Sequence, residues 1–291
     1  MNQPGKIEWR LLAYDEHDAA MNMAVDEAIL ETHLAGMAPP TVRLYGFRPP
    51  AVSIGYAQTL APDVAQRIRA AGLDLVRRPT GGRAVLHLGD LTYSFVGTAS
   101  GAQPDKSNGA QAANEFLSPS IIGAYKQICL GLIGALEHLG VAAEIGTSDS
   151  SYRQLQDCFL ATTTADLHHR GKKLVGSAQL RRGNGVLQHG SLLLNQDQEL
   201  MERLLTGTQG ALSPLTSRGA RHANLFEIAG KNIAISQLEA AMKSGFEKAF
   251  GTELKLGALT ESETKLAGRL RENYLTFTPQ IRSSSLQHAG A

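Results

Sequence analysis

Residues 77–95 read RRPTGGRAVLHLGDLTYSF, and the interpretation of the chain starts from this stretch. The segments on either side of its two glycines, LDLVR and AVLHL, have the composition of β-strands. Gly81 and Gly82 can adopt positive φ without the steric penalty that a Cβ brings, so the pattern predicts a hairpin turn. The turn does not explain the three arginines in the stretch, at positions 77, 78 and 83.

The composition excludes several classes of partner. The 291 residues include 28 Lys plus Arg and 27 Asp plus Glu, a net charge of +1, so neither nucleic acid nor an anionic membrane is expected as a partner. The N-terminal segment MNQPGKIEWRLLAYDEH has no apolar core of a signal peptide. No stretch reaches the roughly 18 to 20 apolar residues of a membrane span, and we expect a soluble, cytoplasmic protein.

Helix and strand patterns alternate along the first half of the chain. Residues 18–36 predict a helix that begins at an Asp18 cap and ends near Gly36. Residues 84–97 predict two paired strands that turn at Gly89-Asp90, whereas residues 97–115 have neither period and predict a surface loop. Further strand patterns lie at residues 41–47, 51–57 and 73–79, and further helix patterns at residues 61–72 and 118–140.

The character of the sequence changes after residue 195. Before it, residues 173–194 predict a β-hairpin whose turn is Gly183-Asn184-Gly185. After it, the patterns are mostly helical, and Ser236 with Glu239 predicts a capping box. We therefore expect an α+β fold of mixed or antiparallel sheets flanked by helices, with a catalytic domain over residues 1–195 and a smaller, mostly helical part with a flexible tail over residues 196–291.

The two cysteines differ in their surroundings. Cys129 lies on the apolar face of the helix predicted at residues 118–140, which indicates a core residue. Cys158 lies in a polar connection near Lys172, Lys173 and His168, where a thiol is accessible and basic neighbours favour the thiolate. From spacing alone, Cys158 is either a nucleophile or an incidental loop residue. Two cysteines in this arrangement form neither a disulfide framework nor a metal site.

Five segments together resemble the biotin/lipoate protein ligase and lipoyl transferase family. They occur in the family's order and span nearly all of residues 7–195. The segments are MNMAVDEAIL (21–30), RLYGFRPPAVSIGYAQ (43–58), RRPTGGRAVLH (77–87), GKKLVGSAQ (171–179) and VLQHGSLLL (186–194). The resemblance implies a biotin/lipoate ligase-like catalytic domain.

Within that family the chain is most similar to the cysteine-dependent octanoyl transferases. These enzymes move octanoate from octanoyl-acyl carrier protein to the lysine of a lipoyl domain. Arg83 stands where the ATP-dependent ligases usually have a third glycine, and Cys158-Phe159 stands where the transferases have their nucleophile. The resemblance implies that Cys158 forms the acyl thioester. After it, LATTTADLHHRG replaces the acidic residue and Ala-Pro-Ser stretch of the transferases.

The resemblance also implies roles for individual residues of these segments. Lys173 aligns with the family's active-site lysine, whose ammonium would stabilise the oxyanion. The glycine turn would leave room for the acyl chain and aim amides at its carbonyl, while Arg78 and Arg83 would receive the phosphopantetheine or acidic carrier protein. The residues expected to bind substrate are Arg78, Gly81, Gly82, Arg83, His87, Gly176, Ser177 and Ala178.

The expected partners are octanoyl-acyl carrier protein and the lipoyl domains of 2-oxoacid dehydrogenases or the glycine cleavage H protein. No cofactor or metal is expected, because the donor thioester is already activated and the chain has neither G-x-x-x-x-G-K-[ST] nor G-x-G-x-x-G after a strand. Three alternatives stay open: an ATP-dependent lipoate ligase, an octanoyl amidotransferase between lipoyl carriers, and a non-catalytic lipoyl-domain binder.

Overall fold

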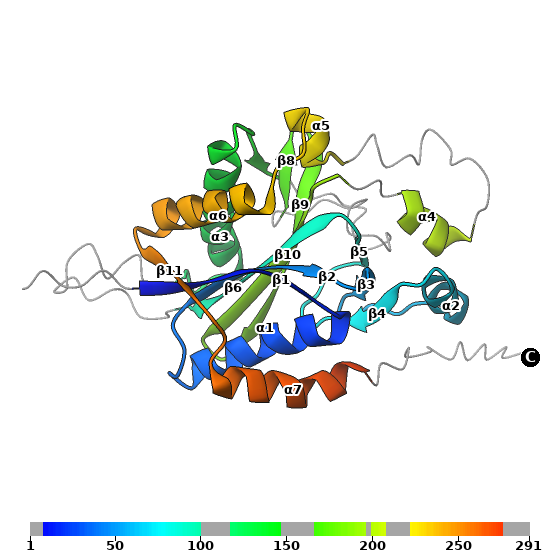
Figure 1. Cartoon of the computed structure of the whole chain (residues 1–291), viewed down its shortest axis with the longest axis horizontal. Coiled ribbons are helices and arrows are strands. Elements are labelled where there is room, and N and C mark those ends of the chain that lie inside the picture. The colour runs from blue at the N-terminus through cyan, green and yellow to red at the C-terminus, as the bar shows by residue number, and fades with distance from the viewer. Residues whose placement is uncertain (1–7, 100–116, 147–165, 196–198, 208–221, 276–291) are drawn as a thin grey trace, which may run out of the picture.

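The computed structural model describes residues 8–99, 117–146, 166–195, 199–207 and 222–275. Its strands form two sheets and helices cover the larger one, so the predicted α+β class is confirmed (Figure 1). The strands are β1 Glu8–His17, β2 Thr41–Phe47, β3 Ala51–Ile54, β4 Asp74–Arg77, β5 Val85–His87, β6 Asp90–Thr98, β7 Glu144–Ile145, β8 Leu167–His169, β9 Lys172–Arg182, β10 Gly185–Leu193 and β11 Glu253–Gly257. The helices are α1 Ala19–Leu34, α2 Pro62–Ala70, α3 Ile121–His138, α4 Glu199–Thr206, α5 Leu225–Ala229, α6 Ile235–Phe250 and α7 Glu261–Leu275.

The larger sheet has the strand order β11-β1-β2-β6-β10-β9-β8-β7. The hairpin predicted at residues 173–194 is confirmed, because β9 and β10 pair antiparallel from Arg182↔Gly185 onward. Every residue of β10 is buried, as expected for a strand in the middle of a sheet covered on both faces. The centre of the sheet is therefore a rigid support for side chains on β6, β9 and β10.

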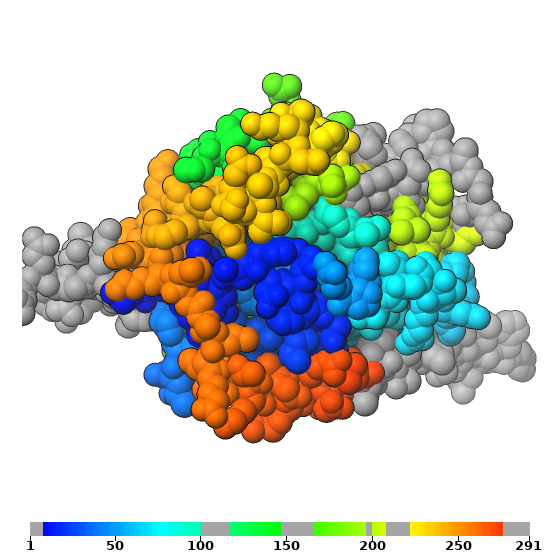
Figure 2. Space-filling view, viewed as in Figure 1, coloured from blue at the N-terminus to red at the C-terminus, as the bar shows by residue number. Residues whose placement is uncertain are grey.

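Helices cover both faces of this sheet. On one face α3 and α6 pack together, and the thiol of Cys129 lies in their shared core, as predicted. On the other face lies α1, which begins at the predicted cap: the Asp18 carboxylate accepts a hydrogen bond from Met21 N at 2.7 Å. α7 packs on α1, and Figure 2 shows the two helices side by side on the surface.

The smaller sheet corrects two predictions. Its strand order is β4-β3-β5, so β3 lies between the two strands that flank the glycine turn. β4 and β5 are thus not a hairpin; residues 78–84 are long enough to cross over β3, since two strand spacings are only about 10 Å. The pairing of β5 with β6 was also wrong, because β5 pairs with β3 while β6 joins β2 and β10.

The segment after residue 195 contacts the rest of the chain extensively. β11 adds to the large sheet parallel to β1, and the buried side chains of Arg10 and Glu263 form an ion pair at 2.5 Å. The domain boundary expected near residue 195 stays a prediction. Within the described residues, no helix has both the length and the apolar character to cross a bilayer.

The start of α6 differs from the predicted capping box. The helix begins at Ile235, and Gln237 Oε1 accepts a hydrogen bond from Ala234 N at 3.0 Å. Glu239 instead accepts a hydrogen bond from Tyr14 N of β1 at 2.7 Å. The Glu239 carboxylate therefore makes a tertiary contact with β1 and does not cap α6.

Candidate active site

The turn at residues 78–84 is shaped from inside by an arginine. Arg78 is buried, and its Nη2 donates to the carbonyl oxygens of Gly81 at 2.7 Å and Arg83 at 2.8 Å. Its Nη1 donates to the carbonyl oxygen of Ser53 on β3 at 3.2 Å. Arg78 therefore holds the turn against the smaller sheet, and its predicted contact with substrate stays a prediction.

Gly82 and Gly55 are required by the geometry of this region. Gly82 has a φ of +95°, a value that L side chains rarely adopt. At Gly55, just after β3, an added Cβ would lie 2.2 Å from the carbonyl oxygen of Gly82. The turn thus packs directly on the backbone that follows β3, which fixes its position beside the neighbouring cavity.

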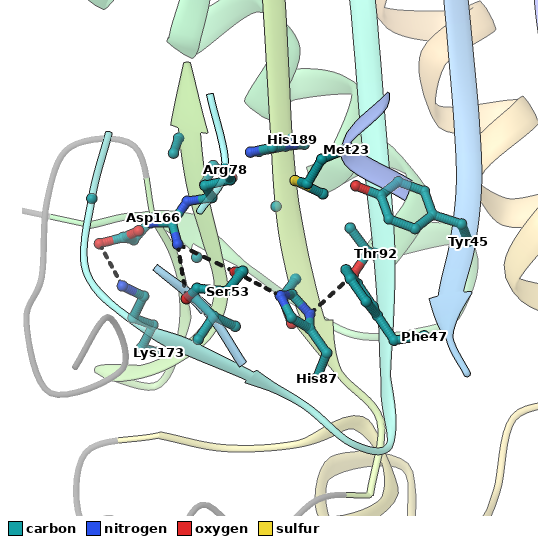
Figure 3. A pocket seen from close by; sticks show the side chains of 17 residues that line it. Met23, Tyr45, Phe47, Ser53, Arg78, His87, Thr92, Asp166, Lys173 and His189 are labelled. Carbon is teal, nitrogen blue, oxygen red and sulfur yellow. Dashed lines mark hydrogen bonds and ion pairs between the residues drawn. The ribbon is translucent and has the colours of Figure 1, made fainter. Parts of the chain in front are cut away.

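A pocket, partly open to solvent, is lined by residues of both sheets. Figure 3 shows Met23, Tyr45 and Phe47 on one side of it and Lys173 and Asp166 on the other. Such an arrangement suits a ligand with an apolar tail and a polar head. The site residues predicted from sequence that line it are Arg78, Gly82, His87, Lys173, Gly176, Ser177 and Ala178.

Lys173 lies at the polar side of this pocket. Its side chain is 2% exposed, and Nζ lies 3.0 Å from Asp166 Oδ2, whose side chain is also buried. Lys172, the preceding residue on β9, is exposed, as expected from the alternation of side chains along a strand. A lysine at the start of a strand is exposed by default, but here β9 turns Lys173 inward to the pocket wall.

His87 is held from both ring nitrogens. Nδ1 lies 2.9 Å from Asp90 Oδ2, and Nε2 lies 2.9 Å from Ser53 Oγ. The ring also stacks on Phe47, with a centroid distance of 3.9 Å. Asp90 in turn accepts hydrogen bonds from Ser191 Oγ at 2.6 Å and from Thr92 Oγ1 at 3.1 Å.

His189 forms a second chain of the same kind. Nε2 lies 2.6 Å from Thr80 Oγ1, and Nδ1 lies 3.0 Å from Asp26 Oδ2. Asp26, on α1, is completely buried and also accepts hydrogen bonds from Arg43 at 2.8 Å and from Tyr45 Oη at 2.8 Å. One carboxylate therefore ties the helix to side chains of β2 and β10.

The pKa values of His189 and Asp26 both lie below their usual ranges. Burial lowers the pKa of His189, although the Asp26 carboxylate opposes the shift, so the imidazole is neutral. Burial alone would raise the pKa of Asp26, but the hydrogen bond from His189 and the charge of Arg43 bring it below its usual range. The pair is thus a neutral imidazole beside a carboxylate whose charge is balanced by arginine.

Some predicted residues lie elsewhere. Cys158 is outside the described residues, as is most of the loop expected at residues 97–115. Arg83 is half-buried. At Gly81 an added Cβ would meet no atom within 4 Å, so lack of space does not require a glycine there. Burial raises the pKa of the Cys129 thiol to about 12, which agrees with the predicted core role. The roles assigned to the site residues stay predictions.

Sequence reasoning missed several polar side chains that line or support the pocket, among them Ser53, Asp26, Asp90 and Asp166. Asp26 had a detectable signal, because it follows Asn22 by four residues and shares the buried side of α1 with apolar neighbours. A carboxylate in such a position must have buried partners. Asp90 was interpreted as a turn residue, and neither Ser53 nor Asp166 had a local signal.

Comparison with known sequences places the chain among lipoylation proteins. Residues 18–247 match the lipoyl protein ligase A/B catalytic domain. A protein named Octanoyltransferase LipM from Symbiobacterium thermophilum is 37% identical over 276 residues, covering 92% of this chain and 95% of that protein. Its namesake from Kyrpidia tusciae is 38% identical over 276 residues, covering 92% and 96%.

Solved structures agree on the fold. A lipoate-protein ligase A bound with ATP matches with a TM-score of 0.70 and 24% identity, covering 93% of this chain and 97% of that chain. A putative lipoate protein ligase from T. acidophilum with bound lipoic acid also gives 0.70 and 24%, covering 91% and 95%. The resemblance predicted from five sequence segments is confirmed, and the chain belongs to the lipoyl protein ligase A/B catalytic domain family.

Proposed function

We propose that this chain is an octanoyltransferase of lipoate biosynthesis. It takes octanoate from octanoyl-acyl carrier protein, holds it as a thioester on Cys158, and delivers it to the lysine of a lipoyl domain. The relatives named Octanoyltransferase LipM, which align over nine-tenths of this chain, support the reaction class. The observation that carries the proposal in the structure is the buried Lys173 ammonium on the wall of a pocket with an apolar end.

The pocket suits an octanoyl group. The tail has about seven methylene or methyl groups, and at roughly 0.8 kcal/mol each their burial contributes on the order of 5 to 6 kcal/mol of gross binding. Met23, Tyr45 and Phe47 line the apolar side that would receive this tail. With the tail there, the thioester carbonyl points toward the polar side, where Lys173 lies.

The chemistry has two steps. The Cys158 thiolate attacks the donor thioester, the phosphopantetheine thiolate of the carrier protein leaves, and the new thioester is nearly equal in energy to the old one. The acceptor amine then attacks the octanoyl-enzyme, the bond to the Cys158 sulfur breaks, and a more stable amide forms. In both steps negative charge develops on the carbonyl oxygen, and a fixed ammonium in a site of low dielectric stabilises it. Nucleotide is not required, because the donor is already activated.

The partners follow from this reaction. The donor is octanoyl-acyl carrier protein, whose acidic surface and phosphopantetheine suit the half-buried Arg83 at the turn. The acceptors are lipoyl domains of 2-oxoacid dehydrogenases or the H protein. One matching structure is described as an archaeal lipoate protein ligase and its E2 lipoyl domain, which supports a lipoyl domain as the acceptor in this fold.

The test separates the transferase from its alternatives. Purified protein is mixed with octanoyl-acyl carrier protein alone and analysed by intact mass, then supplied with a lipoyl domain without ATP. We expect an added octanoyl mass on wild-type protein, none on Cys158→Ala, and an octanoylated lipoyl domain. A strict requirement for ATP and free octanoate would show a ligase instead, transfer only from an octanoylated lipoyl carrier an amidotransferase, and no turnover with any donor a binding protein.

A further inference from the structure

Ser53, His87 and Asp90 form a hydrogen-bonded chain whose first two members line the pocket. Ser53 Oγ lies 2.9 Å from His87 Nε2, and His87 Nδ1 lies 2.9 Å from Asp90 Oδ2. Figure 3 shows Ser53 beside His87 on the pocket wall, with Phe47 against the ring. The three residues come from β3, β5 and the first position of β6, so two sheets fix their relative positions.

The chain determines which nitrogen of His87 holds the proton. A carboxylate only accepts hydrogen bonds, so Asp90 assigns the proton to Nδ1 and leaves the lone pair on Nε2. That lone pair accepts from the Ser53 hydroxyl. A hydroxyl, an imidazole and a carboxylate joined in this order are the arrangement by which proteins hold an imidazole as a general base.

The hydrogen-bond donors to Asp90 determine the charge that His87 faces. Its donors are an imidazole N–H and the hydroxyls of Thr92 and Ser191, all neutral. Across the part of the chain that the structure describes, no lysine or arginine forms an ion pair with Asp90. An imidazolium at His87 would therefore meet a carboxylate whose charge is not yet balanced.

The other titratable groups facing His87 fit the task less well. Arg78, which contacts Ser53, cannot be deprotonated at ordinary pH. Lys173 is held as a cation by Asp166 at 3.0 Å. His189 lies beside Asp26, but Arg43 already balances that carboxylate at 2.8 Å and burial lowers the pKa of the imidazole.

The proposed reaction has a step that needs such a base. A lysine amine has an ordinary pKa near 10.4, and its nitrogen must lose a proton as it becomes an amide. We propose that Ser53, His87 and Asp90 are a proton relay for the acceptor lysine, an inference that rests on the proposed function. The neutral amine forms the N–C bond, the C–S bond breaks, and Cys158 leaves as thiolate. The proton on nitrogen passes to His87 Nε2, directly or through Ser53 Oγ, and then to solvent.

The experiment measures the two half-reactions apart. Octanoyl-enzyme is formed from octanoyl-acyl carrier protein and followed by intact mass; it is then mixed with a lipoyl domain, or with hydroxylamine, which is a neutral nucleophile at pH 7. We expect His87→Gln to become acylated but to transfer to the lipoyl domain about a hundredfold or more slowly. Its reaction with hydroxylamine should stay within a few-fold of wild type, because this small nucleophile is already neutral at pH 7 and the proton that its nitrogen loses can pass to water.

Two further variants keep the inference falsifiable. Asp90→Asn, which retains the shape of the side chain, should slow the lysine reaction in the same selective way if His87→Gln does not fold. Ser53→Ala shows which route the proton takes: a loss like that of His87→Gln places Ser53 in the relay, and wild-type transfer removes it.

The outcomes distinguish two failures. If wild-type protein acquires no octanoyl group, the proposed function is wrong. If wild type and His87→Gln both become acylated and transfer equally fast, the relay is wrong and the proposed function stands. Equal loss of the lysine and hydroxylamine reactions would also overturn the relay, because it would indicate displaced substrate rather than a missing base.

Discussion

His189–Asp26 and His87–Asp90 are two histidine–aspartate pairs beside the same pocket, but only Asp26 also forms an ion pair with an arginine. Asp26 is joined to Arg43 at 2.8 Å and is fully enclosed by α1 and the large sheet, whereas the donors to Asp90 are neutral. A buried network whose charges cancel has little reason to exchange protons. A carboxylate left unbalanced beside a cavity stabilises a cation that forms there. The comparison indicates that the charge balance around the carboxylate, more than the presence of a histidine, distinguishes a structural pair from the pair proposed to carry a proton.

The largest difference should be in stability. In Asp26→Asn the Arg43 guanidinium stays buried without its carboxylate, so we expect the free energy of unfolding to fall by about 3 to 5 kcal/mol. Asp90→Asn breaks only hydrogen bonds between neutral donors and a carboxylate, with an expected loss of about 1 to 3 kcal/mol. Urea denaturation of both variants at pH 7 measures this. Equal losses would mean that the two pairs are the same kind of structure.

Lys173–Asp166 is a third acid–base pair at the pocket, and it tests whether a balanced pair can still act on substrate. If the ammonium stabilises the developing oxyanion, Lys173→Met should slow acylation of Cys158 about a hundredfold, or about 3 kcal/mol in the barrier. Lys172→Met, whose side chain is exposed on the same strand, should have little effect. Single-turnover acylation, measured on protein shown to be folded, decides it. Small losses in both variants would remove Lys173 from the mechanism.

His189 should contribute to the loss of stability at acid pH. Because burial lowers its pKa, the unfolded chain takes up a proton on this residue below about pH 6.5 that the folded chain resists. Its contribution to stability is therefore complete above that pH and is lost as the pH falls, by up to about 1.4 kcal/mol per unit. The stability of His189→Gln should decline less than that of wild type between pH 7 and 5. Parallel declines would show that His189 takes up its proton freely.

The smallest expected effect is the change in unfolding free energy on truncating Cys129, a buried side chain that bears no charge. Cys129→Ala removes one atom from the core between α3 and α6, and burial keeps its thiol neutral, with a pKa of about 12. We expect a loss of about 1 kcal/mol in unfolding free energy, with octanoyl transfer unchanged. Denaturation and the transfer assay check this. A loss as large as that of Asp26→Asn would contradict the view that charge makes the difference.

Local patterns were sufficient for much of the fold. The Asp18 cap, the hairpin at Gly183-Asn184-Gly185 and the core stripe around Cys129 depend on residues within a few turns of one another. The smaller sheet was different, because its central strand β3 comes from earlier in the chain than β4 and β5. A glycine turn between two strands looks the same whether the strands pair or another strand lies between them.

The site was predictable only where the family resemblance supplied a motif. It identified the segments around Lys173 and His87, but it gave no reason to examine Asp90 or Ser53, and the burial of Lys173 follows from Asp166 beside it. These partners come from separate strands and meet only in three dimensions. Asp26 is the exception, since a carboxylate on the buried side of an amphipathic helix is visible in the sequence itself.

The pairing of β1 with β11 has a consequence for synthesis. β1 begins at Glu8 and is synthesised well before its neighbour β11, which ends at Gly257, and Glu263, the partner of Arg10, is synthesised later still. At roughly 5 to 20 residues per second, this edge of the sheet stays uncovered for on the order of ten seconds or more. The nascent chain therefore exposes an unpaired strand edge and an unmatched guanidinium until β11 and α7 have been synthesised, and a chaperone that binds exposed strand edges would act in this interval.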